Sequence, residues 1–431
     1  MYTCGPTVYD FAHLGNLKTY VFEDILRRAL KYNGYQVKQI MNITDIDDKI
    51  IKRAQEEKKN IFKITRPLAK IFFEDIKKLN VEKAEVYPLA TAHIKEIIAL
   101  VGKLLKKRFA YQGKDGSVYF DISKFKNYGK LSRLKKREIK IGARIEADEY
   151  NKSEAQDFVL WKQAKKPNEP FWKSPFGDGR PGWHIECSAM SMKHLGETLD
   201  IHAGGVDLIF PHHENEIAQS EAATGKKFVR HWVHGEHLLV NNQKMSKSLG
   251  NFYTLRDLEK RNFNPLAFRY LVLTSHYRSK LNFTWQSLKA AQNALDNLYD
   301  QYREIQNNNT AKGEKNTKIR KYEKEFLAAI NDDLNTPKAM AIVWQTIGDG
   351  RLSAIAKKQP LLKFDKILGL GLAKLKPLKI PQKIRDLAEK REKLRINKQF
   401  IQSDILRKKI ESLGYKIEDT AYGPKITAAR R

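Results

Sequence analysis

The opening sixteen residues, MYTCGPTVYDFAHLGN, constrain the fold of this chain more than any other stretch. They begin with a short strand-forming run, which is interrupted at Gly5 and Pro6, and they lead into a helical pattern of apolar residues that reaches Leu30. A strand that turns into a helix leaves free backbone N–H groups at the helix N-terminus, where a phosphate group binds favourably. The order therefore predicts a phosphate-binding turn at the start of the chain.

Two polar side chains lie at this turn. His13 and Asn16 are three residues apart, so on the first turn of a helix they point the same way and can both donate hydrogen bonds to one phosphate chain. A histidine near a helix start is also a common cap or surface group, and the turn alone does not separate these interpretations.

A second polar segment changes the balance between them. Residues 243–251, QKMSKSLGN, form a lysine-bearing loop directly after the apolar run 238–240. The HLGN turn followed about 230 residues later by KMSKS resembles the signature pair of the class I aminoacyl-tRNA synthetases, in which both elements bind ATP.

Longer blocks of sequence resemble one family within that class, the cysteinyl-tRNA synthetases. The resemblance covers essentially the whole chain, and the blocks follow one another in the same order, which makes it far more specific than one pentapeptide. The blocks are YTCGPTVYD at residues 2–10, NITDIDDK at 42–49, DFVLWK at 157–162, PGWHIECSAM at 181–190 and FPHHENEIA at 210–218.

The resemblance implies the reaction. A cysteine–tRNA ligase uses ATP to convert L-cysteine to cysteinyl-adenylate, with release of pyrophosphate, and then transfers the cysteinyl group to the 3′ end of tRNA(Cys). No side chain acts as a nucleophile, because the protein positions the reactants and neutralises developing phosphate charge. We therefore expect Mg²⁺ to bind with ATP, and we expect four catalytic residues, His13, Asn16, Lys244 and Lys247.

The same resemblance implies the nucleotide contacts. The glycines at 204 and 205 allow the backbone to approach a nucleotide closely, although an ordinary tight turn also explains them. The class-wide signature has histidine at the position of Asn16, and an amide can donate a hydrogen bond but carries no charge. The expected ATP-binding residues are Thr7, His13, Gly15, Asn16, Gly205, Asp207, Lys244 and Lys247.

Four residues offer a set of zinc ligands. Cys4, Cys187, His212 and Glu216 provide two thiolates, an imidazole and a carboxylate, and the last two share one helix face at a spacing of four. His213 is an alternative ligand, since it is three residues from Glu216. From spacing alone, four protein ligands indicate a closed structural site. The resemblance favours His212 and implies that the metal binds the substrate.

Such a zinc ion explains how cysteine is distinguished from serine. A pocket that discriminates by shape separates such near-isosteres by only roughly a hundredfold. Zinc binds a thiol as thiolate and ligates a hydroxyl weakly, so an editing domain is not needed, and the chain has no insertion of editing size. The resemblance implies that Tyr2, Thr44 and Trp183 bind the amino acid, although core packing also explains Trp183 and a strand or turn hydroxyl also explains Thr44.

Strand-like runs, such as residues 35–41, alternate with amphipathic helical patterns, which predicts an α/β fold with a Rossmann-like parallel-sheet catalytic domain. A connective subdomain is inserted in it, and an α-helical bundle and a small anticodon-binding tail follow. Long helical patterns cover 318–347, 351–370 and 384–413. The expected parts are the catalytic domain at 1–240 with its insertion at about 95–182, the KMSKS loop and helical stem-contact region at 241–306, the bundle at 307–380, and the basic anticodon-binding region at 381–431.

The charge of the chain favours a polyanionic partner. The net charge is +30 and the pI is near 9.8, which fits tRNA. The last 51 residues carry 14 Lys or Arg against 7 Asp or Glu, with Tyr415 and Tyr422 among them. Basic side chains hold phosphates and aromatic rings stack on bases, although an ordinary solvated helix face has a similar composition.

The remaining composition excludes other classes. Two cysteines do not make a disulfide framework, and no apolar run approaches the roughly 18 residues that span a bilayer. We expect a cytoplasmic monomer with no membrane segment. Two other functions compete: a ligase that passes activated cysteine to a small amine, which would lack a basic C-terminal region, and a non-catalytic RNA-binding homologue, which would tolerate loss of the lysines in KMSKS.

Overall fold

The computed structural model describes residues 1–134, 139–145, 155–165, 169–246, 249–307, 317–377, 380–420 and 423–428. Its centre is a sheet of four parallel strands in the order β2-β1-β8-β9. This confirms the predicted α/β class with a parallel sheet. Of the strand expected at 35–41, only Ile40 and Met41 join the sheet. Tyr35, at the start of that stretch, is 65% exposed to solvent. The strands are β1 Tyr2–Thr3, β2 Ile40–Met41, β8 Leu199–Gly205 and β9 Val229–Gly235.

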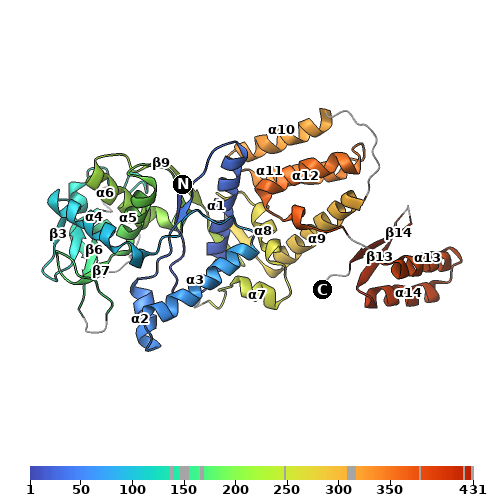
Figure 1. Ribbon diagram of the computed structural model, residues 1–431, viewed down its shortest axis with the longest axis horizontal. Helices are drawn as coiled ribbons and strands as arrows, with labels where there is room; N and C mark the ends of the chain where they lie inside the picture. Colours follow the sequence, from blue (N-terminus) through green and yellow to red (C-terminus); the bar gives the residue numbers. More distant parts are fainter. Residues whose placement is uncertain are drawn as a thin grey trace.

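Helix α1 (Leu14–Tyr32) follows β1 and contacts the central sheet at β8. Its side chains Leu17, Val21 and Ile25 are buried at the spacing of one helix face. Full burial of each such side chain contributes about 2 kcal/mol, so this face fixes α1 on the sheet. The other helices of this part are α2 Asp48–Glu56, α3 Ile61–Lys78, α5 Trp183–Leu195 and α6 Glu214–Thr224 (Figure 1).

A second, mixed sheet occupies the stretch in which we expect the insertion. Its order is β3-β4-β6-β5, and β7 pairs with β6. Its hydrophobic core, in which Phe120 and Trp161 are fully buried, also includes side chains of α5 and α6. Figure 1 shows it at one end of the molecule. Its elements are α4 Ile94–Lys106, β3 Ala110–Gln112, β4 Val118–Phe120, β5 Ile139–Ile145, β6 Ala155–Gln163 and β7 Gly179–Pro181.

A third sheet, in the order β11-β10-β12, carries the start of the KMSKS segment. Strands β10 and β11 form a hairpin in which Asn241 and Asn242 have φ of 49° and 62°, as the tight turns of hairpins require. After α7, Pro265 starts a new helix, α8, behind the cap Asn264. The elements are β10 Leu238–Val240, β11 Gln243–Lys244, β12 Leu281–Phe283, α7 Leu255–Lys260, α8 Pro265–Leu273 and α9 Trp285–Asn307.

Helices make up most of the rest of the chain. Two long patterns are each split into two helices, where Asp333, Leu334 and Lys398 adopt φ of 50°, 56° and 57°. A left-handed residue ends a helix, and none of these three is a glycine or proline that would signal it in the sequence. The helices are α10 Thr317–Asn331, α11 Thr336–Gly348, α12 Ala354–Leu368, α13 Gln382–Ile396 and α14 Phe400–Ser412.

The last helices belong to a separate small unit. Helices α13 and α14 pack with the hairpin of β13 (Tyr415–Thr420) and β14 (Gly423–Ala428) around their own core, which includes Ile384, Ile410 and Ile417. Figure 1 shows this unit at the end of the molecule opposite the inserted sheet. No described helix is both long and apolar enough to cross a membrane.

Candidate active site and metal centre

A cavity of about 490 Å³ lies where the strand order of the central sheet reverses, between β1 and β8. Ligands of open α/β sheets bind outside the carboxyl ends of the strands at this point. The segments after β1 and β8 and the start of α1 form the walls. The expected site residues that line it are Cys4, Thr7, His13, Asn16, Trp183, Gly205 and Asp207.

His13 and Asn16 cap helix α1 reciprocally. The backbone N–H of Asn16 donates to His13 Nδ1 over 3.2 Å, and the backbone N–H of His13 donates to Asn16 Oδ1 over 3.2 Å. Since Nδ1 accepts, the ring proton lies on Nε2, and the amide keeps Nδ2 as a donor. A Cβ at Gly15 would lie 2.8 Å from the His13 ring, so only glycine fits between these residues.

The two residues that directly follow residues 243–251 contact the turn that carries His13. Leu14 N–H donates to Tyr253 O over 2.9 Å, and the Phe252 ring meets the His13 ring edge-on at a centroid distance of 5.2 Å. The two signature elements therefore adjoin, although more than 230 residues separate them in the sequence.

The start of the KMSKS segment is more open. Lys244 is exposed at the end of β11 and is not among the described residues that line the cavity; Lys247 lies outside the described residues. One side chain holds the segment, since Asn251 Nδ2 donates to Lys244 O over 3.1 Å and Asn251 Oδ1 accepts from Ser246 N–H over 2.8 Å. Asn251 itself is only 9% exposed.

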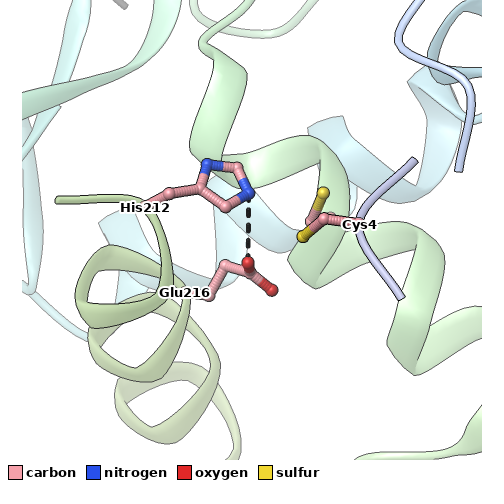
Figure 2. Close-up of side chains that lie close together, drawn as sticks. Cys4, His212 and Glu216 are labelled. Atoms are coloured by element: carbon pink, nitrogen blue, oxygen red, sulfur yellow. Dashed lines mark ion pairs between the residues drawn. The ribbon is translucent and has the colours of Figure 1, made fainter. Parts of the chain in front are cut away.

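The four expected metal ligands come together from four segments. Their ligand atoms all lie within 4.8 Å of one another, and all four side chains are buried. Cys4 follows β1, Cys187 lies in α5, His212 lies in the π-helical turn Ile209–His213, and Glu216 lies in the first turn of α6. Figure 2 shows His212 Nε2 facing Glu216 Oε1, at 3.1 Å, with the Cys4 sulfur beside them.

The charges of this cluster suit a cation. A hydrogen bond from the Cys4 thiol lowers the pKa of Cys187 to about 6, while burial raises the pKa of Cys4. Burial opposes charge on His212, but the Cys187 thiolate and Glu216 raise its pKa to about 10. Burial likewise opposes charge on Glu216, but His202 and His212 lower its pKa to about 2. These shifts favour an ionised thiol and carboxylate beside the His212 imidazole, and this donor set suits a divalent cation that displaces the imidazole proton.

Of the three residues expected to bind the amino acid, one lines the cavity and the other two are not among the described residues that line it. Trp183 lines the cavity, and its ring centroid lies 4.2 Å from that of His212. Thr44 and Tyr2 are buried and are not among the described residues that line the cavity. The Thr44 hydroxyl donates to Glu186 Oε2 over 3.2 Å and accepts from Asn42 Nδ2 over 3.1 Å. Tyr2 packs its ring edge against His202 at 5.0 Å.

Other residues at the site escape sequence reasoning. Three further imidazoles surround the metal cluster besides the alternative ligand His213, and a weak signal exists for them, because eight of the eleven histidines lie in residues 184–237. Acidic, basic and aromatic residues also line the cavity, and no pattern marks them individually. The three imidazoles are His184, His202 and His234, and the additional cavity residues include Asp10, Asp47, Lys49 and Phe252.

Comparisons with known proteins agree with this geometry. The family model described as "tRNA synthetases class I (C) catalytic domain" matches residues 1–293. The curated protein "Cysteine--tRNA ligase" of Chlamydia felis is 47% identical in an alignment of 443 positions, which covers 99% of this chain and 93% of that protein. The protein of the same name from Protochlamydia amoebophila is 45% identical in an alignment of 442 positions, which covers 99% of this chain and 92% of that protein.

Solved structures show the same fold at low identity. Mycobacterium tuberculosis methionyl-tRNA synthetase in complex with methionyl-adenylate aligns with a TM-score of 0.62 at 13% identity, over 86% of this chain and 89% of that chain. Together with the parallel sheet and the two signature elements, this defines a class I aminoacyl-tRNA synthetase. The full-length relatives carry the assignment one step further: the chain belongs to the cysteine–tRNA ligase family.

Proposed function

We propose that this protein is a cysteine–tRNA ligase, which activates L-cysteine with ATP and transfers it to the 3′ end of tRNA(Cys). One observation carries the proposal: the cluster of Cys4, Cys187, His212 and Glu216 adjoins the cavity that His13 and Asn16 also line. A thiol-selecting metal centre and a phosphate-binding helix start therefore serve one cavity.

The first step needs the phosphates of ATP to be held while the cysteine carboxylate attacks the α-phosphate. His13 Nε2–H and the Nδ2 amide of Asn16 are the donors that the capping arrangement leaves for this purpose. Backbone N–H groups at the start of α1 add to them. Lys244 and Lys247, with the Mg²⁺ that accompanies ATP, neutralise the charge that develops on the leaving pyrophosphate.

Gly205, the last residue of β8, and Asp207 also line the cavity. A Cβ at Gly205 would lie 2.3 Å from Asp207 Oδ1, so glycine keeps the cavity open here for the nucleotide. Thr7 completes the floor after β1. We assign the adenosine side of ATP to these residues.

Selection of cysteine rests on the metal centre. The donor set of two sulfurs, one nitrogen and one oxygen matches zinc, and a bound zinc ion would ligate the substrate thiol as thiolate. Trp183 lies beside His212 and forms the wall against the substrate side chain. Thr44 and Tyr2 act from behind that wall, since both are buried, Thr44 with its hydroxyl on Glu186 and Tyr2 with its ring against His202.

The C-terminal unit supplies contacts for tRNA. Its surface exposes apolar side chains next to basic ones: Phe400 is 54% and Ile401 is 81% exposed, and the Arg395 guanidinium lies 6.0 Å from the centroid of the Phe400 ring. Unstacked bases of a tRNA loop bind such aromatic and guanidinium faces. We assign anticodon recognition to this unit, whose expected range is 381–431.

The reduced state of the cysteines fits a cytoplasmic enzyme. Cys4 and Cys187 are both free and buried, and the proposed role in metal binding requires them as thiolates. We propose a monomer, which light scattering coupled to size-exclusion chromatography tests directly.

Two assays test the function. Cysteine-dependent exchange of pyrophosphate into ATP measures activation, and charging of a tRNA(Cys) transcript measures transfer. We expect both from the wild type, while a chain truncated before Pro381 should retain exchange and lose most charging. Exchange without charging in the wild type would favour transfer to a small amine, and absence of exchange would favour a non-catalytic RNA-binding protein.

A further inference from the structure

The metal cluster continues into a second set of potential ligands. Cys4, His202, His213 and Glu216 also have their ligand atoms within 4.8 Å of one another, and all four are buried. This set shares Cys4 and Glu216 with the first and replaces Cys187 and His212 by two imidazoles. We infer that His202 and His213, together with Cys4 and Glu216, form a second metal position that shares one edge with the first. The inference does not depend on the aminoacylation proposed above.

Glu216 is placed to serve both positions. Its Oε1 lies 3.1 Å from His212 Nε2, on the side of the first position, and its Oε2 lies 3.0 Å from His202 Nε2, on the side of the second. One carboxylate thus presents a different oxygen to each imidazole. A carboxylate that only oriented one ligand would not need both oxygens on imidazole nitrogens.

The distances in the second set match tetrahedral coordination. Bond lengths of about 2.3 Å to sulfur and about 2.0 Å to nitrogen place neighbouring ligand atoms about 3.5 Å apart. Cys4 Sγ and His213 Nε2 lie 3.5 Å apart. The rings of His202 and His213 have centroids 4.6 Å apart at an angle of 57°, so the rings are close and do not stack.

The remaining ring nitrogen of His213 is consistent with metal ligation. His213 Nδ1 lies 2.8 Å from His234 Nε2, which gives this imidazole the outer partner that metal-bound histidines usually have. The His202 ring stacks on Trp232 at a centroid distance of 4.7 Å, which fixes its plane. Its Nδ1 is buried and has no hydrogen-bond partner among the described residues.

The difference in donors predicts different preferences. The first position has two sulfurs and one imidazole, whereas the second has one sulfur and two imidazoles. Softer ions favour sulfur, and imidazole suits zinc, cobalt and nickel. The second position therefore becomes visible when the sulfur-rich first position is removed, and Co²⁺ alone is a suitable probe because its absorption reports coordination geometry and thiolate ligands.

The test uses the full-length variant Cys187→Ala/His212→Ala, titrated with Co²⁺ beside the wild type. We expect one bound Co²⁺ with tetrahedral absorption bands and about half of the wild-type thiolate charge-transfer intensity, because one of two thiolates remains. Adding His213→Ala should lower the affinity at least about 100-fold, beyond what loss of an outer partner costs.

Two results would overturn the inference: absence of Co²⁺ binding by the folded double variant, or binding that His213→Ala does not change. Circular dichroism checks folding. If the double variant does not fold, the near-isosteric Cys187→Ser replaces it, and X-ray absorption of its bound zinc decides. One sulfur with two imidazoles supports the second position, while one sulfur with one imidazole, or no bound zinc, contradicts it.

Discussion

The metal cluster and the KMSKS segment, which we propose to serve the same cavity, are built differently. The cluster is buried, and its four ligands are fixed by mutual contacts and by the central sheet. The KMSKS segment carries the exposed Lys244, and its described part is held by hydrogen bonds to Asn251. The proposed amino-acid selection thus depends on a rigid, preorganised cluster, whereas the proposed phosphate binding depends on a more open segment.

The difference follows from what each region must do. Selection of a thiol requires metal ligands that are held at metal-bonding distances before the substrate arrives, because a misplaced ligand lowers the affinity of the site for the metal. Neutralisation of phosphate charge is needed only in the transition state, and ATP must enter and pyrophosphate must leave. Loops with exposed ends allow both. We therefore expect changes in the cluster to alter substrate choice and changes in the segment to alter rate.

The largest expected effect is from Cys187→Ser. A hydroxyl would replace a soft thiolate at the first metal position, so the metal ion would bind there more weakly. The site would then no longer select a thiol. The cysteine KM in pyrophosphate exchange should rise by about 100-fold or more, while the weak activation of serine should hardly change.

X-ray absorption on the wild type provides the control for this variant. The zinc should have two sulfur ligands without substrate and three when cysteine is bound, each at about 2.3 Å. A sulfur count that stays at two would mean a closed structural site, and Trp183 and its neighbours would then have to select cysteine.

The second effect concerns the lysines of the segment. Lys247→Ala should lower kcat for exchange by about 10²–10³-fold with little change in cysteine KM, because the charge acts on the phosphates in the transition state. Lys244→Ala tests the exposed lysine in the same way, and Lys247→Arg keeps the charge. An unchanged exchange rate for Lys247→Ala would contradict the assignment.

A smaller effect is expected from Asn251, which holds the segment without touching substrate. Asn251→Ala removes hydrogen bonds to Lys244 O and Ser246 N–H, so kcat should fall about tenfold as the segment loses its position. Metal content and cysteine KM should stay at wild-type values. Asn251→Asp keeps the acceptor for Ser246 N–H and loses the donor to Lys244 O, so its kcat should lie between those of the wild type and Asn251→Ala. Equal kcat for the wild type and both variants would refute the positioning role.

The smallest expected effect is on stability, and it comes from a buried carboxylate that lacks the partners that Glu216 has. Glu216 has imidazole partners and a pKa of about 2, whereas burial raises the pKa of Asp75 to about 6, and Asp75 Oδ2 has no hydrogen-bond partner among the described residues. A folded-state pKa above the unfolded value means that stability is lost as pH rises from about 4 to about 6.

Asp75→Asn should therefore raise the free energy of unfolding by about 1 kcal/mol at pH 7 to 8, after allowance for solvent screening, and should change it little at pH 4. Denaturant unfolding at the two pH values measures this. A stabilisation of equal size at both would show that the effect is not ionisation of Asp75.

Local sequence determined much of this protein. The strand, turn and helix of residues 1–32, the polar loop after β10 and the four-residue spacing of His212 and Glu216 are short-range patterns, because helix and turn geometry repeats within a few residues. Together with the family resemblance, they predicted the α/β class, the signature elements and the four metal ligands that the structure brings together.

Tertiary structure decided what short-range patterns do not encode. Parallel pairing sets Tyr2 opposite His202, and Cys4 N–H then donates to Ala203 O over 3.3 Å, so residues about 200 positions apart meet at the metal cluster. His202 Nε2 in turn lies 3.0 Å from Glu216 Oε2, while Tyr2 and Thr44 are not among the described residues that line the cavity. The positive φ of Leu334 and Lys398 at the helix breaks was likewise not predicted, since neither residue favours a positive φ by itself.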